Sequence, residues 1–172
     1  HIGNGASVAA VKDGKVMDTS MGLTPLAGLM MGSRSGDIDA SAVTYIMDKL
    51  GKKPQEMADY LNKESGVLGI SGISSDMRDV EKAANEGNER AILALRMYAY
   101  RIKKYIGAYA AAMGGIDTIV FTAGVGENQT SMREQSCEGL EFLGVKIDKE
   151  KNAGIRGEEA IISTPDSKVT VC

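Results

Sequence analysis

The chain has 172 residues, a length typical of one domain, and its 43% hydrophobic and 25% charged residues are ordinary for a globular protein. This composition excludes a disordered tail and a fibrous repeat. The 20 lysines and arginines against 23 aspartates and glutamates give a net charge of −3, so no basic field exists to gather nucleic acid or an anionic membrane. Two cysteines and one histidine predict neither a disulfide framework nor a zinc site.

The two ends of the sequence resemble interrupted elements. Residues 1–5 have the character of the end of an element, and residues 168–172 that of a strand stopped midway, so we expect missing parts at both ends. No signal-peptide pattern is present. The longest uncharged stretch, residues 19–33, contains Pro25 and three glycines, which are incompatible with a membrane-spanning helix. We therefore expect a cytoplasmic protein.

The first third of the chain begins with a predicted β-hairpin. Residues 7–11 and 15–19 flank an Asp13-Gly14 pair, which is typical of a tight hairpin turn. Residues 20–38 form a glycine-punctuated loop without periodicity, and a loop of this length is usually functional.

Two helices are predicted next. Asp39 is a suitable N-cap for a helix through Leu50, and Gly51 lies just past its end. Pro54 is placed to open a second short helix that ends at about Asn62. The apolar face expected for the first of these helices consists of Ala42, Val43, Ile46, Met47 and Leu50.

The central segment combines one extended stretch with two helices. Residues 67–73 are apolar and interrupted by glycine, which predicts a strand or an extended loop. Ser74, Ser75 and Asp76 offer three possible caps to a helix through about Asn85. The longest periodic segment, residues 88–113, predicts a helix that ends at a pair of glycines.

The last third alternates strands and helices. Residues 119–122 predict a buried strand, and residues 123–126 turn from it into a helix over about 130–143. Residues 161–163 and 169–171 predict two further short strands. A hairpin, a block of helices and then alternating elements indicate a mixed α/β architecture.

Two glycine-rich turns are candidate ligand contacts. In residues 123–128, two glycines stand between a predicted strand and a helix, where backbone N–H groups can approach an anion. The same glycines also suit a tight turn that merely needs a positive φ. Gly3-Asn4-Gly5 is a second such loop, with a bulge or a bend as its alternative. No Walker loop is present, and Gln129 stands where a dinucleotide fingerprint needs a small residue, which argues against an NAD-dependent oxidoreductase.

Arg34 is the candidate charged group. It lies in the long loop between small residues, and its planar guanidinium suits a phosphate or a carboxylate. An ion pair with Asp37 or Asp39 that merely orders the loop is the competing interpretation. Asp76 is most simply a helix cap, and His1 alone suggests a solvated terminal residue.

Five segments in the same order make the chain resemble the acetokinase family, the acetate kinases. They cover essentially the whole chain, and those around Arg34 and Asn128 are the most specific. Ser33 is a small departure, because the family more often has threonine there. The segments are residues 1–7, 24–39, 69–79, 121–128 and 138–144.

The resemblance implies a fold and a domain organisation. Residues 1–172 would form a ribonuclease H-like domain, in part, of the sugar kinase/heat-shock chaperone/actin superfold. The chain would be the C-terminal-half nucleotide-binding domain, truncated at both ends. The family's first domain would bring a catalytic Asp, an Arg and a His, and its metal-binding Glu follows the last residue here. The chain alone is therefore expected to be inactive, and no residue in it is assigned to a metal.

The resemblance also implies a function: reversible transfer of a phosphoryl group from ATP to acetate, giving acetyl phosphate and ADP, with Mg²⁺, in a cytoplasmic homodimer. Arg34 would be the catalytic residue. Alternatives are a propionate or butyrate kinase of the same family, or a nucleotide-binding module without catalysis. The implied nucleotide contacts are His1, Gly3, Asn4 and Gly5 at the phosphates, Asp76 and Arg78 at the nucleoside, and Gly124, Val125, Gly126 and Asn128 around adenine and ribose.

Overall fold

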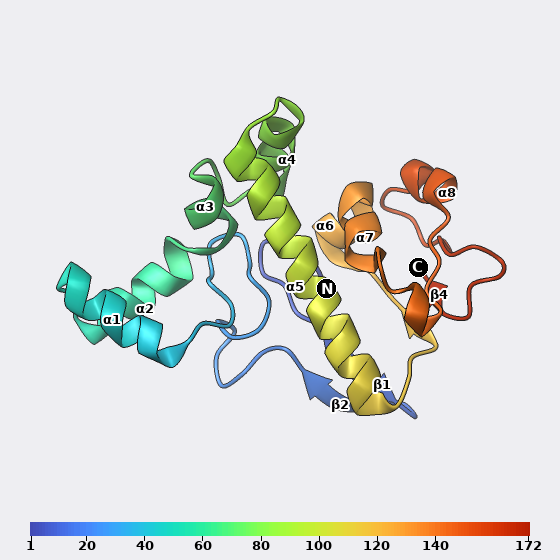
Figure 1. The fold of residues 1–172 in the computed structure, drawn as a ribbon, viewed down its shortest axis with the longest axis horizontal. Helices are drawn as coiled ribbons and strands as arrows, with labels where there is room; N and C mark the ends of the chain where they lie inside the picture. Colours follow the sequence, from blue (N-terminus) through green and yellow to red (C-terminus); the bar gives the residue numbers. More distant parts are fainter. The chain divides into compact units, whose positions relative to one another are not determined.

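The computed structural model describes all 172 residues and confirms a mixed α/β chain with two small sheets (Figure 1). Its contacts divide the chain into two compact units. One consists of His1–Gly3, Val8–Thr19 and Ala99–Cys172, and the other of Asn4–Ser7 and Ser20–Tyr98. The chain passes from one unit to the other inside the first glycine loop, on either side of residues 8–19, and inside the longest helix.

The unit of Asn4–Ser7 and Ser20–Tyr98 is helical and confirms most of the sequence predictions. Asp39 caps α1 by accepting a hydrogen bond from the Ser41 amide, and Gly51 ends that helix at a φ of 62°. Asp76 likewise caps α4, and Pro54 is the first residue of α2. The helices are α1 (Ala40–Leu50), α2 (Pro54–Lys63), α3 (Gly66–Ser71), α4 (Met77–Asn85) and the first part of α5 (Glu89–Met113).

The prediction of a strand or extended loop at residues 67–73 is wrong. This segment forms α3, a helix of 6 residues that starts at Gly66 and is closed by Gly72 at a φ of 69°. A helix this short, with glycines in and around it, offers no apolar periodicity from which to recognise it.

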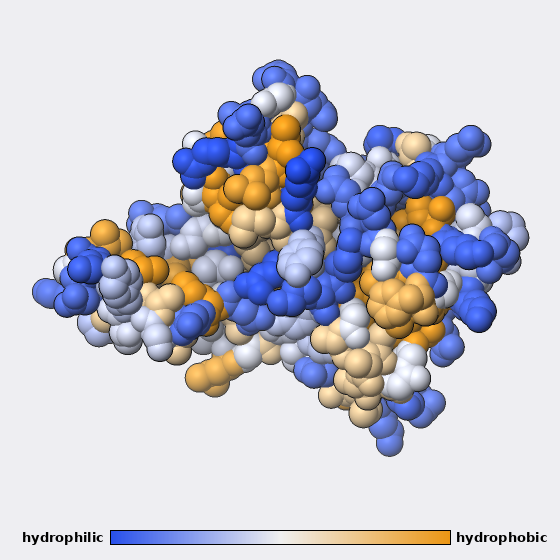
Figure 2. All heavy atoms as spheres, in the orientation of Figure 1, coloured by the Kyte–Doolittle hydropathy of each residue, from blue (hydrophilic) through white to orange (hydrophobic).

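The core of this unit gathers buried side chains from the loop before α1 and from α2 to α5. The predicted apolar face of α1 is not part of it, because none of that helix's residues is buried. Tyr45 and Leu50 are 63% and 54% exposed, and Figure 2 shows apolar atoms at the surface over α1 and α2. The largest buried side chains of the core are Leu29, Met31, Met57, Val67, Val80 and Tyr98.

The other unit begins with the predicted hairpin, which is confirmed. β1 (Ala9–Lys12) pairs antiparallel with β2 (Lys15–Thr19), and Asp13 and Gly14 have φ values of 53° and 72°. Two positive φ angles in a two-residue loop are the signature of the type I′ turn. Lys12 Nζ donates to the carbonyl of Met113, at the last residue of α5.

The rest of this unit carries a two-residue parallel pair, β3 (Thr118–Ile119) with β4 (Thr170–Val171). The prediction of a buried strand at 119–122 is therefore wrong in its bounds and burial, because only Ile119 of that segment belongs to β3 and Val120 is 58% exposed. The predicted strand at 161–163 is reduced to a single bridge between Ser163 and Ile147.

Three helices and a 3₁₀ turn complete this unit: α6 (Ala123–Asn128), α7 (Thr130–Cys137), η1 (Glu141–Leu143) and α8 (Lys149–Gly154). The segment predicted as a turn at 123–126 is therefore the first part of α6. The helix predicted over 130–143 ends at Cys137, because Gly139 adopts a φ of 78°. Both cysteines are free thiols, as the sequence predicts. No helix in the chain is long and apolar enough to cross a membrane.

Candidate functional site

The backbone around Arg34 is held by the start of α3. The amides of Val67 and Leu68 donate to the carbonyls of Met31 and Gly32, each at 2.9 Å, and Ser65 N donates to Ser33 O at 2.9 Å. The first free amides of a helix are natural donors. Here they bind three consecutive carbonyls, so the loop conformation just before Arg34 is fixed.

Gly66 makes this approach possible. It has a φ of 61°, and a Cβ at this position would lie 2.2 Å from Met31 O and 2.6 Å from Arg34 O. Those distances are far inside van der Waals contact, and the positive φ is itself unfavourable for a side chain. Any other residue at position 66 would therefore have to displace residues 31–34, called the arginine loop below.

The guanidinium of Arg34 is oriented by neutral groups. Its Nη1 donates to Pro25 O at 3.1 Å and lies 3.6 Å from Met31 Sδ. An added Cβ on Gly5 would lie 3.6 Å from the same nitrogen, so the arginine lies beside the Asn4-Gly5 turn. The side chain is partly exposed, and its Nε and Nη2 donate to no protein atom. One edge of the guanidinium is thus available to a ligand.

The alternative interpretation of Arg34, an ion pair that orders the loop, is wrong. Asp37 accepts the Gly28 amide at 2.8 Å, and Asp39 accepts the Ser41 amide as the cap of α1. Neither carboxylate pairs with the arginine, whose positive charge has no acidic partner in the chain.

Asn4 is tied to the same loop through Gly32. Gly32 N donates to Asn4 O at 3.0 Å. A Cβ on Gly32 would lie 2.0 Å from Asn4 Oδ1 and 2.6 Å from Ser75 O. A glycine is required at this crossing, and it brings together the Asn4 turn, the arginine loop and the residue that precedes Asp76.

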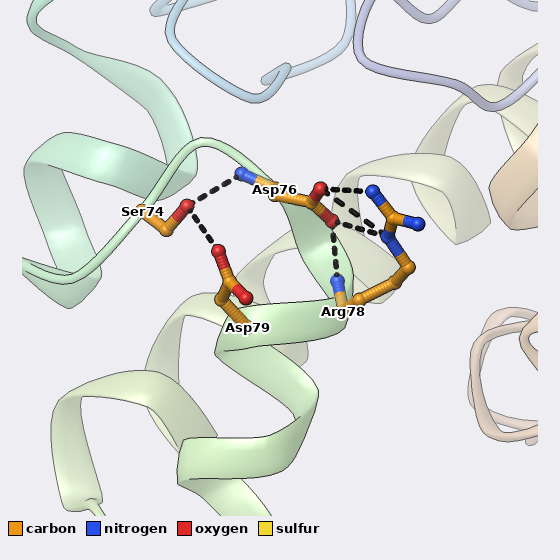
Figure 3. A network of polar contacts seen from close by, with 4 residues as sticks. All are labelled: Ser74, Asp76, Arg78 and Asp79. Atoms are coloured by element: carbon orange, nitrogen blue, oxygen red, sulfur yellow. Dashed lines mark hydrogen bonds and ion pairs between the residues drawn. The ribbon is translucent and has the colours of Figure 1, made fainter.

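Asp76 and Arg78 form an exposed pair at the start of α4 (Figure 3). Asp76 accepts the Arg78 amide at 2.9 Å, and Arg78 Nη2 reaches Asp76 Oδ2 at 2.6 Å. Ser74 Oγ accepts from Asp76 N and donates to Asp79, which fixes the turn before the helix. Asp76 is therefore a cap, as predicted, and it also orients an arginine side chain that is 89% exposed.

The hydrogen bonds from Arg78 lower the pKa of Asp76 from 3.8 to about 2. A carboxyl whose pKa is lower in the folded protein stabilises the fold above its unfolded pKa, and that contribution disappears as the pH falls through the folded value. We expect Arg78→Ala to have a slightly lower Tm than the unmodified protein near neutral pH, and the difference to be lost as the pH falls through about 2. Thermal melts across that range test this. A Tm difference that persists at the acid end would contradict it.

The second group of predicted residues lies at α6, in the other unit. Ile2 N donates to Thr122 O at 2.9 Å, and Ile2 O accepts the amides of Val125 and Gly126 at 2.9 and 3.0 Å. The Ala123 amide donates to Glu127 Oε1 at 2.8 Å. These N–H groups have protein partners, so the suggestion that they approach an anion is not supported. The positive φ belongs to Ala123, at 68°, not to the glycines.

What α6 offers instead is an open surface at Gly124. This glycine is exposed, and nothing lies within 4 Å of the position that its Cβ would occupy. Asn128 Nδ2 donates to Gly124 O at 2.9 Å, which places the asparagine on the same side of the helix. His1 is exposed, with Nδ1 3.3 Å from Thr122 Oγ1 just before α6.

Sequence reasoning missed Arg133, which is only 2% exposed. Its Nη1 donates to the carbonyls of Gly126 at 2.9 Å and Glu127 at 2.7 Å, where α6 ends. Nε and Nη2 donate to Asn152 Oδ1 at 2.8 Å and Ile155 O at 2.7 Å. Burial lowers the pKa of this guanidinium. The signal was present in the sequence, because Arg133 lies three and four residues before the small residues Ser136 and Cys137, a spacing that places all three on one face of a helix.

The sequence profile of the acetokinase family matches residues 1–172, the full length of the chain. The chain belongs to the acetokinase family. An acetate kinase of Phocaeicola vulgatus is 68% identical over 171 residues, covering 99% of this chain and 43% of that protein. The chain thus spans less than half the length of the acetokinase that it matches.

Solved structures of two kinases match the chain over almost its whole length as well. The crystal structure of Porphyromonas gingivalis acetate kinase superimposes with a TM-score of 0.98 at 58% identity, covering 99% of this chain and 43% of the other. A propionate kinase from Francisella tularensis superimposes with a TM-score of 0.91 at 44% identity, covering 100% and 44%. An acetate kinase and a propionate kinase therefore both share the fold.

Proposed function

We propose that this chain is the C-terminal-half nucleotide-binding domain of a longer enzyme that transfers a phosphoryl group reversibly between ATP and acetate. Its expected fold is part of a ribonuclease H-like domain of the sugar kinase/heat-shock chaperone/actin superfold. The proposal is supported by family membership over residues 1–172 and by the 43% share of the acetate kinase that the chain covers. The observation that carries it is the arginine that lies without an acidic partner beside a glycine turn.

Arg34 is the proposed catalytic residue. Phosphoryl transfer needs mainly positioning and neutralisation of charge on the equatorial oxygens in the transition state. The free edge of the Arg34 guanidinium supplies donors for those oxygens, while Pro25 O and Met31 Sδ hold the opposite edge. A donor that is already oriented needs no reorganisation during the reaction, which is the basis of electrostatic catalysis.

The nucleotide contacts are proposed by group. Asn4 and Gly5 would lie beside the phosphates, with Gly5 leaving room next to Arg34. Asp76 and Arg78 would approach the nucleoside, where the exposed planar guanidinium of Arg78 could stack on a base. His1 and Gly3 would also lie near the phosphates. Gly124, Val125, Gly126 and Asn128 would line the adenine and ribose pocket, through the open surface of α6 rather than through its amides.

Gly124→Ala separates binding from folding. Alanine in a helix is favoured over glycine by roughly 0.5–1 kcal/mol, and the new methyl group meets no atom of the chain. We expect the variant to be at least as stable as the unmodified protein, yet to have a higher KM for ATP, because the methyl group enters the space proposed for the nucleoside. Steady-state kinetics and thermal melts of the full-length protein measure both.

Gly107→Ala in the interior of α5 is the matched control for Gly124→Ala. Its added Cβ also meets nothing within 4 Å. We expect the same gain in stability without any change in the KM for ATP. An unchanged KM in both variants would remove Gly124 from the nucleotide site.

The acceptor is proposed to be acetate, with propionate as the second candidate because a propionate kinase shares the fold at 44% identity. Butyrate is a third possibility within the family. A panel of acetate, propionate and butyrate with the full-length protein, read out as trapped acyl hydroxamate, tests this. The highest kcat/KM with acetate is expected, and no transfer from ATP to any of the three would overturn the proposal. The 172 residues alone are expected to bind nucleotide without catalysing transfer.

Magnesium, a homodimer and a cytoplasmic location are proposed on the family resemblance. The chain holds no group of three or more His, Cys, Asp or Glu side chains that could bind a metal ion. No step of the mechanism proposed here passes through the metal. Sedimentation of the full-length protein would test the dimer.

A further inference from the structure

Arg133, the buried arginine of α7, makes hydrogen bonds that the stability of its own helix does not require. A charge is costly to bury, and buried arginines are normally paired with carboxylates. Arg133 is 2% exposed and forms no ion pair. Its donors go to backbone carbonyls of two segments and to one amide side chain.

Two of these bonds go to the end of α6. A helix of 6 residues is not stable by itself, so its position depends on what holds its two ends. Ile2 O accepts hydrogen bonds from the amides of Val125 and Gly126 in the middle of the helix, and Arg133 Nη1 donates to the carbonyls of Gly126 and Glu127 in its last turn. A cation at the C-terminal end of a helix is also favourable for the helix dipole.

The same guanidinium connects α6 to the end of α8. Asn152 accepts from Arg133 through both its side chain and its carbonyl, and Ile155 O accepts a further bond. Two residues on, Gly157 N donates to Glu127 O at 3.2 Å. Gly157 also lies next to Asn128, whose Oδ1 would be 3.4 Å from an added Cβ. Arg133 thus fixes the position of the segment that carries Gly124 and Asn128, although its own side chain is buried.

We propose that Arg133 is a positioning residue for the nucleoside, one that fixes α6 so that Gly124 and Asn128 are placed to receive the adenosine of ATP or ADP. The inference rests on the proposed function, because it assumes that α6 contacts a nucleoside. It assigns Arg133 no contact with the reacting phosphates. A substitution at Arg133 should therefore weaken the binding of ligands that carry a nucleoside and leave the binding of other ligands unchanged.

The experiment compares Arg133→Met with Arg156→Met in the full-length protein. Methionine removes every donor, and Arg156 is an exposed arginine close in sequence to the segment that Arg133 holds, which makes its variant a matched control. Calorimetric titration with ADP and with pyrophosphate gives a readout that is independent of catalysis. We expect about 10- to 100-fold weaker ADP binding for Arg133→Met, unchanged pyrophosphate binding, and a raised KM for ATP with the KM for acetate preserved.

Equal weakening of ADP and pyrophosphate in a folded Arg133→Met protein, or unchanged ADP binding, would overturn the inference. Should that variant fail to fold, Arg133→Lys keeps a cation near the α6 carbonyls, and a smaller loss confined to ADP is expected; a loss shared with pyrophosphate would count against the idea. Failure of the unmodified protein to bind ADP would instead contradict the proposed function, so the two failures are distinguishable.

Discussion

Arg34→Ala in the full-length protein is expected to reduce kcat by about 10²–10³-fold, the usual cost of removing one oriented donor from a transition state. Nucleotide affinity should be largely kept, because the proposed nucleoside contacts lie on other residues. The loop itself should stay folded, since its carbonyls are bound by α3 amides and not by the arginine side chain. The hydroxamate assay gives kcat, and ADP titration gives the affinity.

Arg96→Ala is the control for this prediction, because Arg96 is an exposed arginine of α5 outside the arginine loop. It should leave kcat unchanged. Arg34→Lys keeps the charge but not the planar pair of donors, so we expect only partial recovery of kcat. Unaltered turnover in Arg34→Ala would remove the residue from the catalytic machinery.

Gly66→Ala is the second change for which we expect a large effect, and it acts through the backbone. The left-handed conformation alone costs a side chain about 1–2 kcal/mol. The Cβ placed 2.2 Å from Met31 O adds an overlap, and forced overpacking typically costs about 1–3 kcal/mol. We therefore expect both a loss of stability in urea unfolding and a fall in kcat, because the loop that carries Arg34 must shift.

Gly51→Ala distinguishes the cost of the left-handed conformation from the cost of the overlap with Met31 O. Gly51 has a φ of 62°, against 61° for Gly66, but nothing lies within 4 Å of its Cβ position. It should show the conformational cost only, with kcat unchanged. Equal losses of stability in the two variants would mean that the contact with the arginine loop contributes nothing.

Local signals in the sequence predict the helices well where they are complete. A helix cap involves only a few adjacent residues, so it can be recognised locally. Asp39 and Gly51 mark the two ends of α1, and Asp76 marks the start of α4. α3 is different, since its start depends on carbonyls of residues 31–33 that no local pattern contains. The exposure of the apolar face of α1 was unpredictable for the same reason, because periodicity predicts an apolar face but not what covers it.

The contacts of the candidate site residues could not be predicted from the sequence. Small neighbours single out Arg34, yet only the fold shows that Asp37 accepts the Gly28 amide instead of pairing with the arginine. The glycines of α6 suggested backbone amides that could bind an anion, but Ile2 O accepts hydrogen bonds from the amides of Val125 and Gly126. Arg133 escaped notice because a lone arginine in a polar segment normally faces solvent.

The bonds between α3 and the arginine loop give the proposed catalytic group a spectroscopic reporter. The amide protons of Val67 and Leu68 can exchange with solvent only when their bonds to Met31 and Gly32 open. Their deuterium uptake therefore measures how often the segment that carries Arg34 leaves its place. Comparing this uptake with and without ligand would reveal whether the protein holds its guanidinium ready beforehand or organises it only on binding.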